Sequence, residues 1–131
     1  MDLPNIESVF DFDYTSELGK RYEGRFTVLC LLDIGQKHRL ALEKTRLLGN
    51  HAFPTEELSA YALVLSNLRI KIVDAPEWWK QSNGGYNIKD EDALVALYDK
   101  LSLAEIEWKA KLIQKGQAAT EAAAAPQNSQ S

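Results

Sequence analysis

Two short segments near the N-terminus alternate apolar and polar residues, and this pattern constrains the fold more than any other. In residues 9–14 (VFDFDY) the aromatic side chains fall on one side of an extended chain and the two aspartates on the other. Residues 25–31 (RFTVLCL) alternate in the same way. We therefore expect an antiparallel hairpin, joined by an exposed connection over about Ser16 to Tyr22. The side chains predicted to share the inner faces are Phe10, Phe12, Tyr14, Phe26, Val28 and Cys30.

The segment after the second strand carries helix signals. Asp33 precedes Gln36 by three residues, the spacing at which two side chains satisfy free amides at a helix start, and Gly49 follows the last apolar residue of the run. Thr55 precedes two glutamates and a second amphipathic run that reaches about Ile70. Two amphipathic helices are therefore predicted. Ile70 and the three residues after it also alternate like a strand, so helix and strand both remain open there.

The C-terminal half begins with a short helix and a turn. Pro76 suits the first turn of a helix, since it lacks the amide hydrogen that would be unsatisfied there, and the run SNGG at 82–85 breaks the chain. Asp90 is placed to cap a long amphipathic run that should end near Lys115, as one helix or as two. Residues 116–131 are rich in alanine, glutamine and serine and offer little apolar area to bury.

These segments predict an α+β protein with a single domain over residues 1–115 and a flexible low-complexity tail over residues 116–131. The domain should consist of an N-terminal antiparallel β-hairpin followed by a mainly α-helical body, and the C-terminal tail should be disordered. A chain of 131 residues suits one such domain.

Charge and composition exclude several classes of partner. The formal net charge of -4 gives no basic field for phosphate backbones, so nucleic acid is not an expected partner. No apolar run approaches the roughly 20 residues needed to cross a bilayer, and no leader pattern stands at the N-terminus. A membrane is therefore not an expected partner either. Cys30 is the single cysteine and cannot form an intrachain disulfide, which suits a cytoplasmic protein.

No set of side chains indicates catalysis or a metal site. His38, His51 and Cys30 form no metal-binding motif with a neighbour, and Cys30 fits a small core residue better than a nucleophile. The acidic pairs fall on the outward strand face or at helix starts, where they have structural roles. We therefore expect no catalytic residue, no metal and no cofactor. A small enzyme or nucleotide-binding protein is the least favoured class.

Binding of other proteins is the remaining class of function. The adjacent Trp78 and Trp79 point about 100° apart on a helix, so one should lie in the core while the other is partly exposed. The partly exposed one either anchors a partner or packs against the edge of the core. The predicted partner-binding residues are Leu58, Tyr61, Leu65, Trp78, Trp79, Tyr98 and Trp108. The first predicted helix also has a basic face, which comprises Lys37, Arg39, Lys44 and Arg46. We interpret this face as solvent-exposed, in preference to a docking surface for an acidic partner.

The motifs along the chain also follow a recognisable order. GRFTV at 24–28 opens the second strand, and RLLG at 46–49 ends the first helix. LSNLRI at 65–70 then leads to DAPEWW at 74–79. Over about residues 8–115 the chain resembles the tail assembly chaperones of long-tailed bacteriophages. That family combines a small N-terminal β element with a helical body and a disordered C-terminal extension.

The resemblance implies a non-enzymatic protein of virion morphogenesis in the host cell cytoplasm. Such a protein binds the long, helical tape measure protein and keeps its apolar stripes from aggregating until tail tube subunits polymerise. Anchors at helical spacing in an apolar groove would supply this binding. Two alternatives stay open: a small structural protein kept in the virion, such as a head-tail connector or baseplate component, and self-association of the chain.

Overall fold

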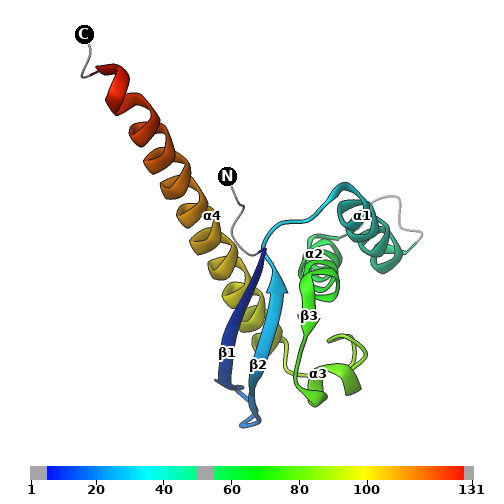
Figure 1. Cartoon of the computed structure of the whole chain (residues 1–131). Coiled ribbons are helices and arrows are strands. Elements are labelled where there is room, and N and C mark those ends of the chain that lie inside the picture. The colour runs from blue at the N-terminus through cyan, green and yellow to red at the C-terminus, as the bar shows by residue number, and fades with distance from the viewer. Residues whose placement is uncertain (1–5, 50–54, 129–131) are drawn as a thin grey trace.

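A three-stranded sheet and four helices make up the described part of the chain. The computed structural model describes residues 6–49 and 55–128, with side chains through Gln117. The elements follow in the order β1 (Glu7–Thr15), β2 (Arg21–Leu29), α1 (Ile34–Leu48), α2 (Glu56–Lys71), β3 (Ile72–Asp74), α3 (Glu77–Gln81) and α4 (Glu91–Asn128) (Figure 1). The predicted α+β fold is therefore confirmed. Residues 1–5, 50–54 and 129–131 of the predicted domain and tail, His51 among them, lie outside the described residues.

The β1–β2 hairpin forms as the alternation predicts. The two strands pair antiparallel with Phe10 opposite Phe26 and Asp11 opposite Arg25, so the aromatic residues share one face and the charged residues the other. All six side chains predicted for the inner faces are buried or partly buried. The connection is shorter than predicted and consists of residues 16–20.

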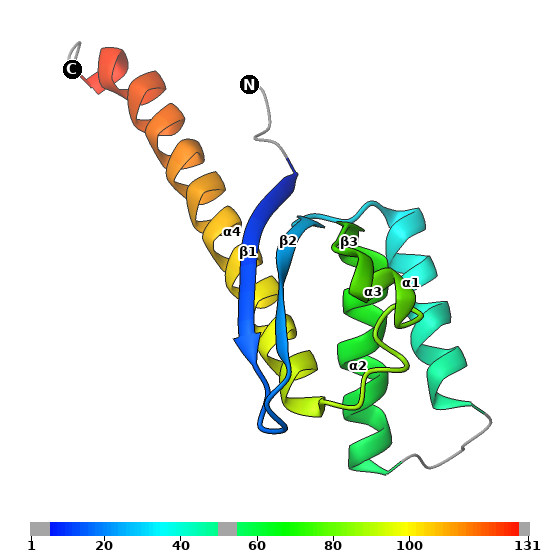
Figure 2. The same ribbon diagram turned by 90° about the horizontal axis from the view of Figure 1, so that it is seen from below.

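The alternating segment after α2 is a strand. α2 continues through Lys71, and Ile72–Asp74 then form β3. β3 pairs antiparallel with β2, with Ile72 opposite Val28, which gives the strand order β1-β2-β3. Figures 1 and 2 show α1 and α2 on the β3 side of the sheet, whereas α4 runs along the hairpin.

The core lies between the inner face of the hairpin, α2, α3 and the first half of α4, and Leu68 of α2 is fully buried in it. Phe26 is fully buried and stacks on Phe10 with 5.7 Å between ring centroids, and both tryptophans of α3 contact its ring edge to face. Leu97 and Leu101 of α4 are also fully buried. Burial of each of these large side chains is worth about 1.5 to 3 kcal/mol. The hairpin therefore draws its stability mainly from packing.

Two glycines let α3 pack closely on its neighbours. At Gly24 of β2 a Cβ atom would lie 2.6 Å from Pro76, the residue before α3. At Gly85, where φ is +87°, a Cβ atom would lie 2.7 Å from the Trp79 ring. A side chain at either position would displace α3, since both distances are shorter than real Cβ contacts. The turn predicted at 82–85 therefore also allows Trp79 to pack.

The predicted caps of α1 and α2 are confirmed, and that of α4 needs a correction. Asp33 and Gln36 form a capping box at the start of α1, and Thr55 Oγ1 accepts a hydrogen bond from an amide of the first turn of α2. The Asp90 carbonyl accepts hydrogen bonds from first-turn amides of α4. Its side chain, however, accepts from Tyr22 Oη, because Asp90 is buried against the hairpin.

α4 extends further than predicted. The sequence predicts an end near Lys115, but the backbone continues as one helix through Asn128. This alanine-rich stretch has little to bury, yet alanine has the highest intrinsic helix propensity, and that local preference favours a helical backbone. The C-terminal part of α4 projects past the sheet (Figure 1). No helix within residues 6–49 and 55–128 is long and apolar enough to span a bilayer.

Candidate functional site

An apolar groove lies where α1, α2, the loop before α4 and the start of α4 meet. Its volume is about 330 Å³. Leu58, Tyr61 and Leu65, three of the predicted partner-binding residues, line it from α2. Leu47 of α1 and Leu94 of α4 contribute apolar side chains from the other walls. The structure thus brings these three predicted residues together on one concave surface.

The α2 wall of the groove follows from the helical period. Four lining residues share one face of α2 at the spacing i, i+3, i+4 and i+7. They are Leu58, Tyr61, Ala62 and Leu65. Ala62 and Leu65 are buried, whereas Leu58 and Tyr61 are partly exposed. A partner side chain can therefore contact Leu58 and Tyr61 without disturbing the core.

The rim of the groove is polar and mostly acidic. Tyr61 Oη donates a hydrogen bond to Glu57 Oε1 at 2.9 Å, and Glu91 and Lys89 also line the groove. The bond to Glu57 and the nearby Glu91 carboxylate raise the pKa of Tyr61 to about 12. The Tyr61 hydroxyl therefore stays protonated at neutral pH. The two carboxylates favour a basic residue beside an apolar anchor.

A partly buried polar cluster joins α1 to α2. Glu43 of α1 contacts Arg69 of α2, with 2.8 Å between Oε1 and Nε, and also contacts Arg46. Hydrogen bonding from Arg46 and the charge of Arg69 hold the pKa of Glu43 below its usual value. Arg69 Nη1 donates to Asn83 O at 2.6 Å, which extends the cluster to the loop before α4. Since α1 contains no buried residue, ion pairs and partly buried side chains hold this wall of the groove.

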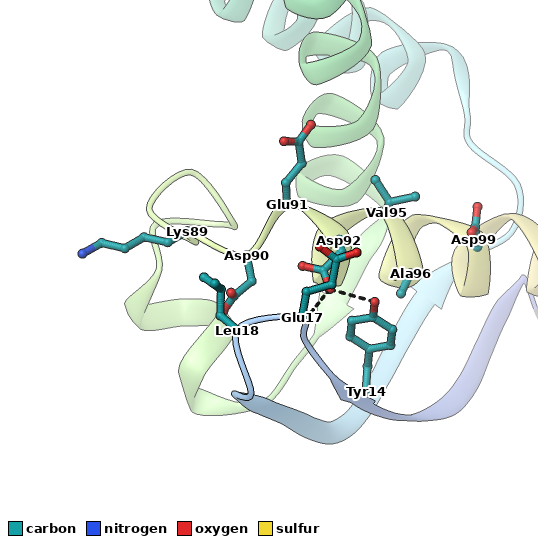
Figure 3. A pocket seen from close by; sticks show the side chains of 10 residues that line it. All are labelled: Tyr14, Glu17, Leu18, Lys89, Asp90, Glu91, Asp92, Val95, Ala96 and Asp99. Atoms are coloured by element: carbon teal, nitrogen blue, oxygen red, sulfur yellow. Dashed lines mark hydrogen bonds between the residues drawn. The ribbon is translucent and has the colours of Figure 1, made fainter.

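A second, larger cleft of about 730 Å³ lies between the hairpin tip and the start of α4 (Figure 3). Five of its ten lining residues carry a carboxylate, and Leu18, Val95 and Ala96 add apolar surface. Asp92 accepts hydrogen bonds from Tyr14 Oη at 2.8 Å and from Glu17 N at 2.9 Å. These bonds, the Glu17 amide first, hold the pKa of Asp92 below its usual value. Asp92 therefore attaches the hairpin tip to α4.

Asp90 lies deeper at the same place. Its exposed fraction is only 4%, its Oδ2 accepts a hydrogen bond from Tyr22 Oη, and its Oδ1 has no hydrogen-bond partner among the described residues. Burial and the bond to Asp90 raise the pKa of Tyr22 to about 12. The buried Tyr22–Asp90 pair thus fixes the hairpin on α4.

Across the described ranges, no cluster of His, Cys, Asp or Glu has a geometry that could hold a metal ion.

Four of the aromatic residues predicted to bind a partner, Trp78, Trp79, Tyr98 and Trp108, pack in the core or against it. Trp79 and Trp108 are buried, so neither lies on a docking surface of the folded chain. Trp78 is partly exposed, but its Nε1–H donates to Glu23 O at 2.8 Å and its ring packs against the core. Tyr98 also packs against the core. Of the two adjacent tryptophans, Trp79 is the core residue and Trp78 the partly exposed one, and both serve packing.

Sequence reasoning did not assign the groove walls that elements other than α2 supply. Leu47, Ile88 and Leu94 line the groove from α1, the loop before α4 and α4 itself. Leu47 and Leu94 belong to apolar runs of their helices, but such a run does not indicate which neighbour it faces. Only the α2 stripe carried a signal in sequence, its helical spacing.

Cys30 is a core residue, as predicted. It is buried, and its Sγ lies 3.8 Å from Ala104 O of α4. Burial raises the pKa of the Cys30 thiol, which therefore stays protonated at neutral pH.

Comparisons with known proteins identify no relative of this chain. No protein-family model matches the chain, and no curated protein or solved structure is significantly similar to it. A functional proposal therefore depends on the groove and on the motif order.

Proposed function

We propose that the protein is a non-enzymatic tail assembly chaperone of a long-tailed bacteriophage, and that the groove binds a helical segment of the tape measure protein. The observation that carries this proposal is the α2 stripe at i, i+3, i+4 and i+7, which faces an open apolar groove of about 330 Å³. The motif order over about residues 8–115 supports the assignment to a phage tail.

The groove suits the apolar face of an amphipathic helix. A helix that docks in this way places anchors at helical spacing between the side chains of the receiving surface. Leu58 and Tyr61 supply partly exposed edges for these anchors, and Leu47 and Leu94 line the facing walls. Each Å² of apolar surface removed from water contributes about 25 cal/mol. Binding should therefore depend on apolar contact more than on charge.

The acidic rim adds selectivity among helices. Glu91 lines the groove, and Glu57 is held beside it through the hydrogen bond from Tyr61. A partner helix with a basic residue next to its apolar anchors is favoured, and one with an acidic residue there is disfavoured. Glu57 and Glu91 are exposed, so added salt should weaken the complex only modestly.

The small size of the groove suits transient shielding. One groove covers only a short part of a helix, so each contact is weak and many copies are needed along a long helical protein. Weak contacts dissociate quickly, because differences in affinity between related complexes arise mainly in the dissociation rate. Tube subunits can then replace the protein as the tail grows.

Co-expression with tape measure fragments tests the proposal. Wild-type protein is expected to raise the soluble fraction of a helical fragment. Leu58→Asp should abolish this effect, because it places a carboxylate in the apolar groove. Leu42→Asp is the matched control, since Leu42 is an exposed leucine of α1 that does not line the groove. Melting curves check that both variants fold.

The outcomes separate the candidate functions. Loss of solubilisation with Leu58→Asp alone supports the groove as the binding site. Equal solubilisation by wild type and a folded Leu58→Asp variant contradicts it. Recovery of the protein from purified phage particles at a fixed copy number would favour a permanent structural role in the virion.

A further inference from the structure

The middle of α4 carries a second apolar stripe that the core does not use. Leu103, Ile106 and Ile113 are 49%, 64% and 60% exposed, and Ala110 between them is exposed as well. Their spacing of three, four and three residues is the a/d repeat of a coiled-coil seam. A contiguous apolar stripe of this kind marks an interaction surface.

This stripe lies on the side of α4 opposite the core. Ile106 is two residues from both Ala104 and Trp108, which are buried. Because each residue turns the helix by about 100°, residues two apart point to nearly opposite sides. α4 therefore presents one face to its own chain and another away from it.

We propose that the stripe of Leu103, Ile106, Ala110 and Ile113 joins two copies of this chain by antiparallel packing of α4 on α4. Asp99, which is exposed, stands on the same stripe four residues before Leu103. In a parallel pair in register, Asp99 would face its own copy, and the like charges would repel. In an antiparallel pair centred between Leu103 and Ile106, Asp99 faces Ala110 of the second copy, and Leu103 faces Ile106.

The flanking charges fit the same register. Lys100 and Glu107 lie seven residues apart along one edge of the stripe, and both are exposed. In an antiparallel pair this edge meets the same edge of the second helix, so Lys100 lies beside Glu107 of the second copy. The two-fold axis of the dimer creates a second, identical pair, between Glu107 of the first copy and Lys100 of the second. The edge of the stripe is thus complementary in charge to itself. This favours a second copy of the chain as the partner of the stripe, because binding of an unrelated helix would not require Lys100 and Glu107 to match each other.

The contact between the two helices is short. From Asp99 to Ile113 the helix rises about 21 Å at 1.5 Å per residue. Such a seam buries less than the roughly 1,600 Å² of a standard interface, so the dimer should be reversible and concentration-dependent. The stripe does not overlap the α2 stripe of the groove, and the dimer does not depend on the proposed function.

Sedimentation velocity over about a hundredfold range of protein concentration tests the dimer. Wild type is expected to shift from monomer to dimer, and Ile106→Asp to remain monomeric. Ile34→Asp is the matched control and should dimerise like wild type, because Ile34 is 79% exposed on α1 and not on the stripe. A wild-type protein that stays monomeric at every concentration, or a dimeric Ile106→Asp variant, overturns the proposal.

A charge exchange tests the register of the dimer. Glu107→Lys should weaken dimerisation about tenfold, because two attractive pairs become repulsive. The double variant Lys100→Glu with Glu107→Lys restores both pairs in an antiparallel dimer. Its dissociation constant should therefore return close to the wild-type value. A double variant that dimerises no better than Glu107→Lys alone overturns the antiparallel register.

Discussion

The inner face of the β1–β2 hairpin and helix α1 are attached to the molecule by different means. Phe26 and Val28 of the hairpin are fully buried in the core that α2, α3 and α4 complete. α1 contains no buried residue, but it has a complete capping box and the Glu43–Arg69 ion pair to α2. Of these two elements, the one with the complete capping box is therefore the one that buries less. Local signals specify that an element forms, and not how firmly it is attached.

The difference assigns separate roles to the two regions. The hairpin, α3, the first half of α4 and the buried face of α2 around Leu68 form a packed scaffold. α1 closes one side of the groove with Leu47, and its attachment depends on ion pairs and partly buried side chains. Regions with few buried apolar contacts open at lower free energy than the core. We therefore expect α1 to move first when a partner helix enters the groove.

Truncation in the hairpin core should produce the largest loss of stability. Phe26→Ala is expected to lower the free energy of unfolding by about 3 to 5 kcal/mol, because it leaves a cavity under the aromatic cluster. Arg25→Ala should cost much less, since the Arg25–Asp11 ion pair is exposed. Urea titration of the two variants measures the difference. Equal costs would contradict the assignment of inner and outer faces.

Alkaline pH should weaken the hairpin side through Tyr22. Burial, and then the bond to Asp90, raise the pKa of Tyr22 from 10.0 to about 12. Because this pKa is higher in the folded state than in the unfolded state, the stabilisation is complete below pH 10 and is lost as the pH rises towards 12. The loss should amount to about 2 to 3 kcal/mol.

Denaturant titrations from neutral pH to about pH 12 measure this loss. Tyr22→Phe should decline less steeply than wild type over the alkaline range. Tyr86→Phe, a change at an exposed tyrosine, should follow wild type. An equally steep decline in Tyr22→Phe would show that Tyr22 does not couple folding to alkaline pH.

The loop between α3 and α4 and the tip of the hairpin allow a comparison of two glycines at nearly equal φ. Gly85 and Gly19 have φ values of +87° and +88°, but only at Gly85 would an added Cβ meet a neighbour, the Trp79 ring at 2.7 Å. Gly85→Ala should therefore lower the free energy of unfolding by about 1 to 3 kcal/mol more than Gly19→Ala does. Because the two φ values are nearly equal, this difference reports the penalty of overpacking alone. Thermal unfolding of both variants measures it. Equal losses would show that the loop shifts without disturbing Trp79.

Loss of the α1 cap should have the smallest and most local effect. Asp33→Ala removes the acceptor of the 2.8 Å hydrogen bond from Gln36 N and is expected to cost about 1 kcal/mol. Because α1 buries no residue, the loss should appear as faster hydrogen exchange in α1, with the amides of β2 unchanged. A matching increase in β2 would show that α1 and the hairpin open as one unit.

The parts of the fold that sequence predicts well depend on residues a few positions apart. The alternation around Phe12 and Phe26 indicates which face is inward, because side chains alternate along any strand. The spacing of Asp33 and Gln36 indicates the start of α1, because it reflects the geometry of a single helical turn. Both signals can be read without knowledge of the tertiary arrangement.

The site depends on contacts between distant segments, and these could not be predicted. Asp90 has the position of a helix cap in sequence, yet its side chain bonds to Tyr22, 68 positions away. The groove combines Leu47, Leu65 and Leu94 from three helices, and helical periodicity does not specify which helices meet. The tryptophans of α3 are likewise placed by the hairpin and the loop that pack on them.

Hydrogen exchange with and without a helical tape measure fragment shows whether α1 and α2 bind the partner while the hairpin serves as scaffold. We expect slower exchange on binding in residues 34–48 and 56–65, with residues 7–29 unchanged. Protection confined to the hairpin or to the exposed stripe of α4, with α1 and α2 unchanged, would contradict it.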